Sequence, residues 1–201
     1  MNQLIEKPDK IFENIKTQIK IGVKNRNHDF HTPVFSNLKK NGLIESRVVV
    51  LRSFNSNELK INFHTDIRSK KIEELKAYPK TNFLFYDHKS KIQLRIQSTS
   101  KIFYNNNVTK FAWDQTRLSS RKCYLAQEPP SSKSIVSTDS IPRHLIGIDP
   151  GLEESEEGYK NFSIVSSQIE SIDWLYLSSK GHRRLLIAVN NIKNSYKWLI
   201  P

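Results

Sequence analysis

The stretch FHTDIRSKKIEEL (residues 63–75) joins the end of a predicted strand to the start of a predicted helix. Its apolar spacing predicts a helix over residues 70–78, and a proline follows as the stop signal. The first turn is basic, although the N–H groups at a helix start favour acidic side chains by roughly 0.3–1 kcal/mol each. The sequence therefore raises the question of what Arg68, Lys70 and Lys71 face.

Two explanations account for this basic turn. If residues 47–54 and 58–65 form a hairpin, Arg47 comes close to the start of the helix. Arg47, Thr65 and the two lysines would then surround one anion, such as a phosphate, beside the helix N–H groups. Alternatively, the lysines are solvated and the two glutamates that follow offset them by roughly 0.2–0.5 kcal/mol per pair. The segment by itself leaves both explanations open.

The flanking sequence predicts a mainly β protein. Strands are predicted at residues 47–54, 58–65, 82–88, 91–104, 162–177, 183–190 and 195–201. Helices are predicted at residues 9–24, 70–78 and 107–124, and residues 127–158 are predicted to be a loop-rich insertion. We therefore expect one domain, residues 1–201, built as a small β-barrel of six or more mostly antiparallel strands with peripheral helices.

Composition favours an anionic partner. The 201 residues carry a net charge of +12, with a pI of about 9.7. Residues 149–158 hold five of the 20 carboxylates and no Lys or Arg, which leaves the rest of the chain at +17. There is no apolar run of the kind found in a signal peptide or membrane span, so we expect a cytoplasmic protein without a membrane partner.

The sequence lacks the motifs that several kinds of binding site require. Cys123 is the single cysteine, and no CxxC or HxH pattern accompanies it, so neither a disulfide nor a metal site is expected. No GxGxxG or GKS/GKT motif occurs either, which disfavours a Rossmann or P-loop nucleotide site.

Four segments together resemble a known family. RVVVLR, FHTDIRSKK, FLFYDHKSKIQLRIQ and DWLYLSSKGHRRLLI are similar, in order and approximate spacing, to the blocks of the pyridoxamine 5′-phosphate oxidase superfamily. These proteins are FMN-binding split barrels, and the sequence resembles the oxidase-related branch more closely than the true oxidases. The resemblance implies an FMN-dependent oxidoreductase that takes a hydride onto flavin N5. It also implies a homodimer with FMN at the subunit interface and a phosphorylated small-molecule substrate.

The resemblance further implies a set of cofactor-binding residues. These are Arg47, Val48, Val49, Val50, Leu51, Arg52, His64, Thr65, Lys70, Lys71, Gln93, Trp174 and Arg184. The basic helix start is thereby assigned to the FMN phosphate, with His64 beside the ribityl chain. Gln93 would reach FMN from the partner subunit, and Trp174 with Arg184 would enclose the isoalloxazine. Gln127 lies where the family has another phosphate contact, but the surrounding loop is shorter and differs in composition.

The implied substrate site departs from the family pattern. Its residues would be Arg52, Trp113, Arg117, Lys180 and His182, and Arg184 and His182 are the catalytic candidates. The true oxidase has a tyrosine where this chain has Trp113 and an arginine where it has Lys180. These two differences leave open whether this protein oxidises pyridoxine or pyridoxamine phosphate.

Two other function classes remain as alternatives. A carrier or sensor would bind FMN without turnover and would keep Arg47, Lys70 and Lys71. A nucleic-acid-binding β-barrel would use the positive charge together with Phe83, Phe85 and Tyr86 as a stacking surface, and it is the less favoured of the two.

Overall fold

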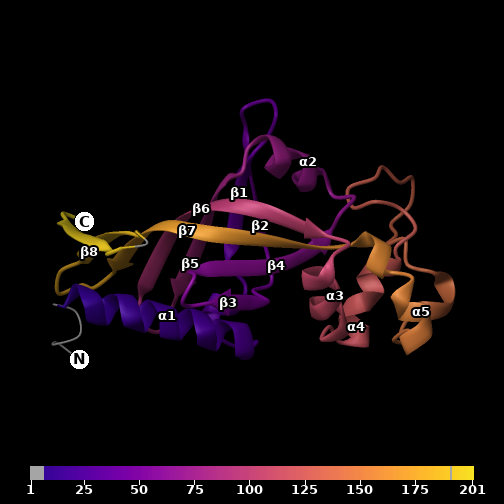
Figure 1. The fold of residues 1–201 in the computed structure, drawn as a ribbon, viewed down its shortest axis with the longest axis horizontal. Coiled ribbons are helices and arrows are strands. Elements are labelled where there is room, and N and C mark those ends of the chain that lie inside the picture. The colour runs from indigo at the N-terminus through magenta and orange to yellow at the C-terminus, as the bar shows by residue number, and fades with distance from the viewer. Residues whose placement is uncertain (1–6, 191) are drawn as a thin grey trace.

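The computed structural model describes residues 7–190 and 192–201, and its main feature is one antiparallel sheet (Figure 1). In this described part, nine strands form the sheet. They are β1 (Val34–Leu38), β2 (Ile44–Val48), β3 (Ser53–Asn55), β4 (Lys60–Asp66), β5 (Lys80–Asp87), β6 (Ile92–Tyr104), β7 (Phe162–Tyr176), β8 (Arg183–Ala188) and β9 (Ser195–Leu199). The predicted mainly β class is confirmed. The predicted domain of residues 1–201 includes residues 1–6 and 191, which lie outside the described part.

Helices surround the sheet at different places. They are α1 (Pro8–Lys24), α2 (Lys70–Ala77), α3 (Asn107–Asp114), α4 (Leu118–Arg121) and α5 (Leu152–Glu156), with 3-10 turns at Asp29–His31, Lys122–Leu125, Arg143–Leu145 and Tyr159–Asn161. Figure 1 shows α3, α4 and α5 gathered at one end of the sheet, with β8 and the C-terminus at the other. None of the described helices is long and apolar enough to cross a membrane.

The segment between β2 and β3 closes the sheet into a split barrel. The strand order is β2-β1-β5-β6-β7-β4-β3, and β8 and β9 continue from β7. Val49 and Leu51 donate backbone hydrogen bonds to carbonyls just before β1, at 3.0 and 2.9 Å, and Arg52 donates one to Asn62 of β4, at 2.9 Å. Residues 49–52 therefore connect the two ends of the sheet. The predicted single strand 47–54 is instead divided into β2 and β3 by this bend.

Aromatic side chains fill the barrel interior. Phe35 lies 4.8 Å from Phe63 and 5.0 Å from Phe83, between ring centroids. Phe83 and Phe85 are fully buried in this core, so the less favoured alternative, in which they form a surface for stacking nucleic-acid bases, is wrong. Phe83 and Phe85 alternate along β5 and both point into the core, so neither ring is available to a base. Tyr86, on the other face of β5, is partly exposed.

The main differences from the sequence prediction lie in short elements. β1 was not predicted, because its five residues, VFSNL, contain two polar side chains and lack a long apolar run. The helix predicted at residues 107–124 breaks into α3, α4 and a 3-10 turn. The loop-rich region 127–158 contains α5 within its acidic segment. The predicted helix 9–24 and the helix after residue 69 are confirmed.

Candidate functional site

The basic helix start forms part of a polar cluster centred on Lys71. Its Nζ lies 2.8 Å from Thr65 Oγ1 and 2.6 Å from Ser69 Oγ, and both hydroxyl-bearing residues are buried. Burial, and next the nearby Arg47 guanidinium, lower the pKa of Lys71. In residues 7–190 and 192–201, Lys71 makes no ion pair with a carboxylate. A partly buried ammonium with only hydroxyl partners is suited to a further anionic partner.

Arg47 reaches the same cluster from β2. Its guanidinium donates to Asn37 Oδ1 and, at 2.7 Å, to Glu45 Oε2. Asn37 in turn donates to the buried carboxylate of Glu74 on α2, at 2.8 Å. These bonds tie β1, β2 and α2 together and hold the Arg47 charge near Lys71. Arg47 thus lies near the helix start, as predicted, but the predicted hairpin of residues 47–54 with 58–65 is wrong at this end, because Arg47 pairs with Phe35 of β1 and only residues 53–55 pair with β4.

The start of α2 leaves its own N–H groups without a side-chain cap. Ser69 is the N-cap residue, yet its hydroxyl contacts Lys71 and makes no capping hydrogen bond to the helix. Serine at this position usually satisfies a first-turn N–H group. The uncapped N–H groups, the Lys71 ammonium, the Arg47 guanidinium and two hydroxyls are the donor types that hold a phosphate monoester.

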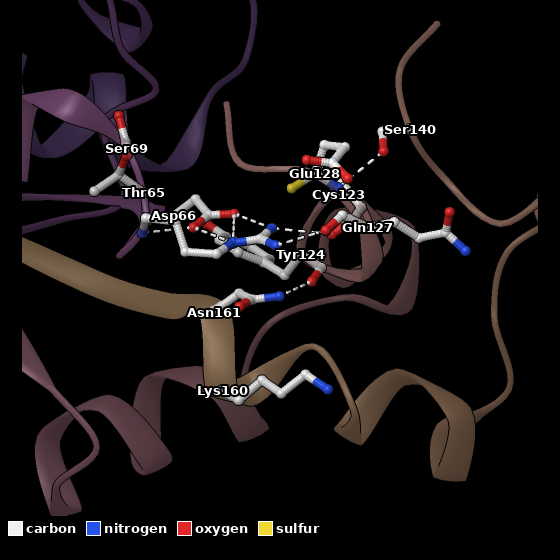
Figure 2. A network of polar contacts seen from close by, with 12 residues as sticks. Thr65, Asp66, Ser69, Cys123, Tyr124, Gln127, Glu128, Ser140, Lys160 and Asn161 are labelled. Carbon is white, nitrogen blue, oxygen red and sulfur yellow. Dashed lines mark hydrogen bonds and ion pairs between the residues drawn. The ribbon is translucent and has the colours of Figure 1, made fainter. Parts of the chain in front are cut away.

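Arg68 faces away from this cluster. Its guanidinium pairs with Asp66 at 2.7 Å and donates to the carbonyl oxygens of Ala126, at 3.0 Å, and Gln127, at 3.3 Å (Figure 2). Hydrogen bonding to Asp66 raises the pKa of Arg68. Lys70 is exposed to solvent. Of the three basic residues, Arg68 thus anchors a loop and Lys71 contacts the two hydroxyls, whereas no hydrogen bond in the described part of the chain connects the Lys70 side chain to this cluster.

The loop anchored by Arg68 is also held from the start of β7. Asn161 donates to the Tyr124 carbonyl at 2.8 Å and accepts from the Ile67 N–H at 2.8 Å. Figure 2 shows the Gln127 side chain pointing away from the Asp66–Arg68 pair. Only the backbone of Gln127 takes part in this network, so the structure does not place its amide at the phosphate-type cluster.

A groove of about 650 Å³ lies on the outer side of β4, between the end of α1 and the α3–α4 region. Arg52 and Arg117, both predicted to bind substrate, line it, as does His64. Burial lowers the pKa of His64 to about 3, with a contribution from Arg52. His64 is therefore a neutral imidazole at ordinary pH, and its ring packs edge-on against Phe162 at 4.7 Å.

His64 and Thr65 were predicted to line one site, and the structure separates them. Successive side chains on a strand point to opposite faces. Thr65 turns toward Lys71, whereas His64 faces the groove with Asn62. The phosphate-type cluster and the groove therefore lie on opposite faces of β4, and the segment 47–52 passes between them.

The structure places Trp113 in a second buried cluster, outside the groove. Trp113 is 0% exposed, its Nε1 donates to Glu156 at 3.1 Å, and the Arg121 guanidinium lies 4.7 Å from its ring centroid. The α3 side chains that line the groove are Val108, Phe111 and Ala112, of which Phe111 is 71% exposed. The sequence by itself does not choose between the two faces of this helix. Thr109 and Trp113 are spaced i, i+4 on one face of α3, which turns Phe111 to the other.

Gln93 and Arg184 lie on the outer face of the sheet. Arg184 donates to Asp173 at 3.0 and 2.8 Å, and Arg95 pairs with the same carboxylate at 2.5 Å. Although burial opposes it, bonding to Arg184 and Arg95 lowers the pKa of Asp173. Along the sheet, Gln93 is three strands from β2 and Arg184 is five, or about 14 and 24 Å at usual strand spacing. By the other route, Arg52 bonds to Asn62, which pairs with Ser166 of β7, whereas Gln93 and Arg184 pair with Leu175, nine residues or about 30 Å further along β7. By either route, both side chains lie far from residues 47–52 of their own chain.

The other predicted residues of this region are not gathered with Arg184. Trp174 is 4% exposed and lies opposite Leu94 and Leu185, on the inner face of the sheet. Trp174 and Arg184 thus point to opposite faces and do not enclose one ring within a chain. Lys180 and His182 are exposed in the β7–β8 turn, where His182 Nδ1 accepts from the Ser178 N–H at 3.0 Å.

Comparisons with known proteins identify the family and the fold. The family described as "Pyridoxamine 5'-phosphate oxidase, FMN-binding domain" matches residues 12–104. The pyridoxine/pyridoxamine 5'-phosphate oxidase 2 of Arabidopsis thaliana is 30% identical over 156 residues, which cover 74% of this chain and 73% of the relative.

Two solved structures, each 16% identical, share the fold. A pyridoxamine 5'-phosphate oxidase-related, FMN-binding protein from Nostoc punctiforme has a TM-score of 0.74, with 94% of this chain and 96% of that chain covered. PhzG from Burkholderia lata, solved with tetrahydrophenazine-1-carboxylic acid, has a TM-score of 0.73, with 100% and 97% covered. The chain therefore belongs to the pyridoxamine 5′-phosphate oxidase-related family of FMN-binding split-barrel proteins.

Proposed function

We propose that this protein binds FMN and acts as an FMN-dependent oxidoreductase on a small anionic substrate. The observation that carries the proposal is the Lys71 cluster, in which one ammonium, the Arg47 guanidinium, two hydroxyls and uncapped helix N–H groups converge. This donor set fits the FMN phosphate. FMN, when bound, supplies hydride acceptance at N5 of its ring.

The chain contributes binding and orientation to this reaction. Lys71 and Arg47 hold the phosphate end of FMN, and the segment 47–52 leads from there toward the groove. Arg52 and Arg117 bind the anionic group of the substrate. His64, as a neutral imidazole, orients ligands by hydrogen bonding and adds no charge to the groove. The groove itself supports an enzyme over a carrier, because a carrier requires no second pocket beside the flavin.

A second copy of the chain completes the proposed site. The outer sheet face exposes apolar side chains of β2 and β5, namely Ile44 at 75%, Val48 at 63% and Leu84 at 37%. Gln93 and Arg184 share this face but lie too far from residues 47–52 of their own chain. Packing two such faces together buries the apolar residues and brings Gln93 and Arg184 of one protomer toward the FMN site of its partner.

The test is reconstitution followed by turnover. The purified protein is incubated with FMN, separated from unbound flavin, and examined by visible absorption and size-exclusion chromatography. We expect about one FMN per chain and a dimer. Pyridoxamine 5′-phosphate, the substrate class named for the Arabidopsis relative, is then tested for aerobic hydrogen peroxide release. A colourless protein contradicts the cofactor proposal. A yellow protein that no phosphorylated amine or alcohol reduces supports the carrier alternative instead.

A further inference from the structure

The groove beside β4 has basic side chains on two opposite walls. Lys24 and Arg26, at the end of α1, form one wall, and Arg117, at the N-cap of α4, belongs to the other. Arg52 and Lys60 lie along the floor. Figure 1 shows α1 ending near α3 and α4, with β3 and β4 above. The family resemblance accounts for Arg52 and Arg117 but assigns no role to the basic residues of α1.

Most of these charges have no carboxylate partner among the residues that the structure describes. Lys60 pairs with Glu58 at 2.9 Å, which neutralises it. In residues 7–190 and 192–201, the remaining four basic residues of the groove form no ion pair with Asp or Glu. These four are Lys24, Arg26, Arg52 and Arg117. Their mutual repulsion in one groove is relieved by an anionic ligand.

Helix stability explains only part of this arrangement. A lysine in the last turn of a helix interacts favourably with the negative end of the helix dipole, and this interaction explains the presence of Lys24. Arg26 lies beyond the C-cap residue Asn25, outside the helix, and still lines the groove. The α1 wall therefore presents more positive charge to the groove than the helix end requires.

The space between the two walls suits a flat apolar body. Phe111 and Val108 of α3 are 71% and 53% exposed, and both line the groove. The floor includes alternate residues of β4 from Lys60 to His64, a span of about 13 Å at the usual rise per strand residue. Arg52 lies at the His64 end of this span, where it affects the His64 pKa. α1 packs against β3, and the residues at its end, Lys24 and Arg26, line the same groove.

We infer that the groove binds an aromatic ligand with two separated anionic groups, one held by Arg52 and Arg117 and the other by Lys24 and Arg26. The inference rests on the proposed function only in identifying this ligand as the substrate. It narrows the substrate class from a monophosphorylated small molecule to a ring compound that is anionic at both ends. The basic end of α1 is then a specificity-determining element.

The experiment compares two probes that share one ring system. Naphthalene-2-sulfonate carries one anion, and naphthalene-2,6-disulfonate carries two at opposite ends. Binding is measured by titration calorimetry on the full chain, both FMN-reconstituted and FMN-free. We expect the disulfonate to bind about fivefold to thirtyfold more tightly, since two further partly exposed ion pairs contribute up to about 1 kcal/mol each.

A double variant locates the second subsite. Lys24→Gln with Arg26→Gln should remove the preference for the disulfonate while leaving monosulfonate binding unchanged. The matched control, Lys10→Gln with Lys20→Gln, lowers net charge equally on exposed positions of the same helix that do not line the groove. Circular dichroism verifies that both variants fold. Equal affinities of the two probes for the unaltered protein, or an equal loss in the control, would overturn the inference.

The two proposals can fail separately in this experiment. A preference for the disulfonate that depends on Lys24 and Arg26 but occurs in a protein unable to bind FMN supports the groove and rejects the flavin function. A yellow, FMN-loaded protein with no preference rejects the two-anion groove and leaves the flavin function intact.

Discussion

The Lys71 cluster and the groove beside β4 lie on opposite faces of one strand, yet they are built differently. In the cluster, Lys71, Thr65 and Ser69 come from one short segment and hydrogen-bond to each other. In the groove, Arg52 and Arg117 come from distant segments and face an open space of about 650 Å³. The cluster is organised before any ligand arrives, whereas four of the basic side chains in the groove form no ion pair within the described part of the chain. This contrast suggests a site for a permanently bound cofactor beside a site for an exchangeable ligand.

The largest expected effect is on the free energy of unfolding and concerns the packing of α3 beside the groove. Trp113→Ala removes a fully buried ring from the packing that supports α3, and Phe or Trp truncations of this kind cost about 3–5 kcal/mol. Urea unfolding should show this loss, with weaker ligand binding in the groove. Phe111→Ala, at a 71% exposed position on the same helix, is the matched control and should change the unfolding free energy by less than about 0.5 kcal/mol. Equal destabilisation by both would contradict the separate packing roles of the two rings.

The next effect concerns the cofactor cluster. Lys71→Ala should weaken FMN binding roughly 10- to 150-fold, because hydrogen bonds to charged groups contribute about 1.5–3 kcal/mol. Flavin fluorescence quenching during titration measures the Kd. Lys76→Ala on the same helix removes an exposed lysine paired with Glu73 and should leave the Kd within about twofold. If Lys71→Ala binds FMN as tightly as the unaltered protein, the phosphate lies elsewhere.

A third prediction concerns pH and the His64 side of β4. The folded-state pKa of His64 is about 3, below its ordinary 6.5, so the unfolded chain takes up a proton that the folded chain does not. Its contribution to stability is therefore complete above pH 6.5 and decreases as pH falls from 6.5 toward 3. At pH 6 the loss is roughly 1 kcal/mol. Urea unfolding at pH 7.5 and pH 6 should show a smaller decrease in His64→Gln, and an identical decrease would show that His64 is not buried in its neutral form.

The smallest expected effect tests whether the groove acts independently of the cluster. Arg117→Gln should weaken binding of pyridoxal 5′-phosphate about twofold to fivefold, since an exposed ion pair contributes about 0.2–1 kcal/mol. The Kd for FMN should not change, because Arg117 lines only the groove. Titration calorimetry with each ligand makes the comparison. If Arg117→Gln weakened the binding of FMN as much as the binding of pyridoxal 5′-phosphate, the two regions would form one site.

Some contacts of the candidate site could be predicted from the sequence because they join residues close together in the chain, whereas others depend on packing between distant segments. Lys71 and Thr65 are six residues apart, and strand and helix geometry alone bring their side chains into contact. Trp113 was assigned to the substrate because it occupies a family position, but the choice between it and Phe111 depends on which face of α3 packs on the sheet. The opposite orientations of His64 and Thr65 follow from strand alternation and could have been stated from the sequence.

The sequence by itself determined the mainly β class, the helices at residues 9–24 and after residue 69, and the basic helix start, because these depend on local periodicity and on neighbours within a few residues. Only the tertiary structure decided that 47–54 bends into two strands and that Arg47 approaches Lys71 from a strand paired with β1. It also decided that Trp174 and Arg184 face opposite sides of the sheet, and that the end of α1 meets Arg117 across a groove. These relations depend on barrel closure and strand register. Both are determined by contacts between segments far apart in the chain, which local patterns do not encode.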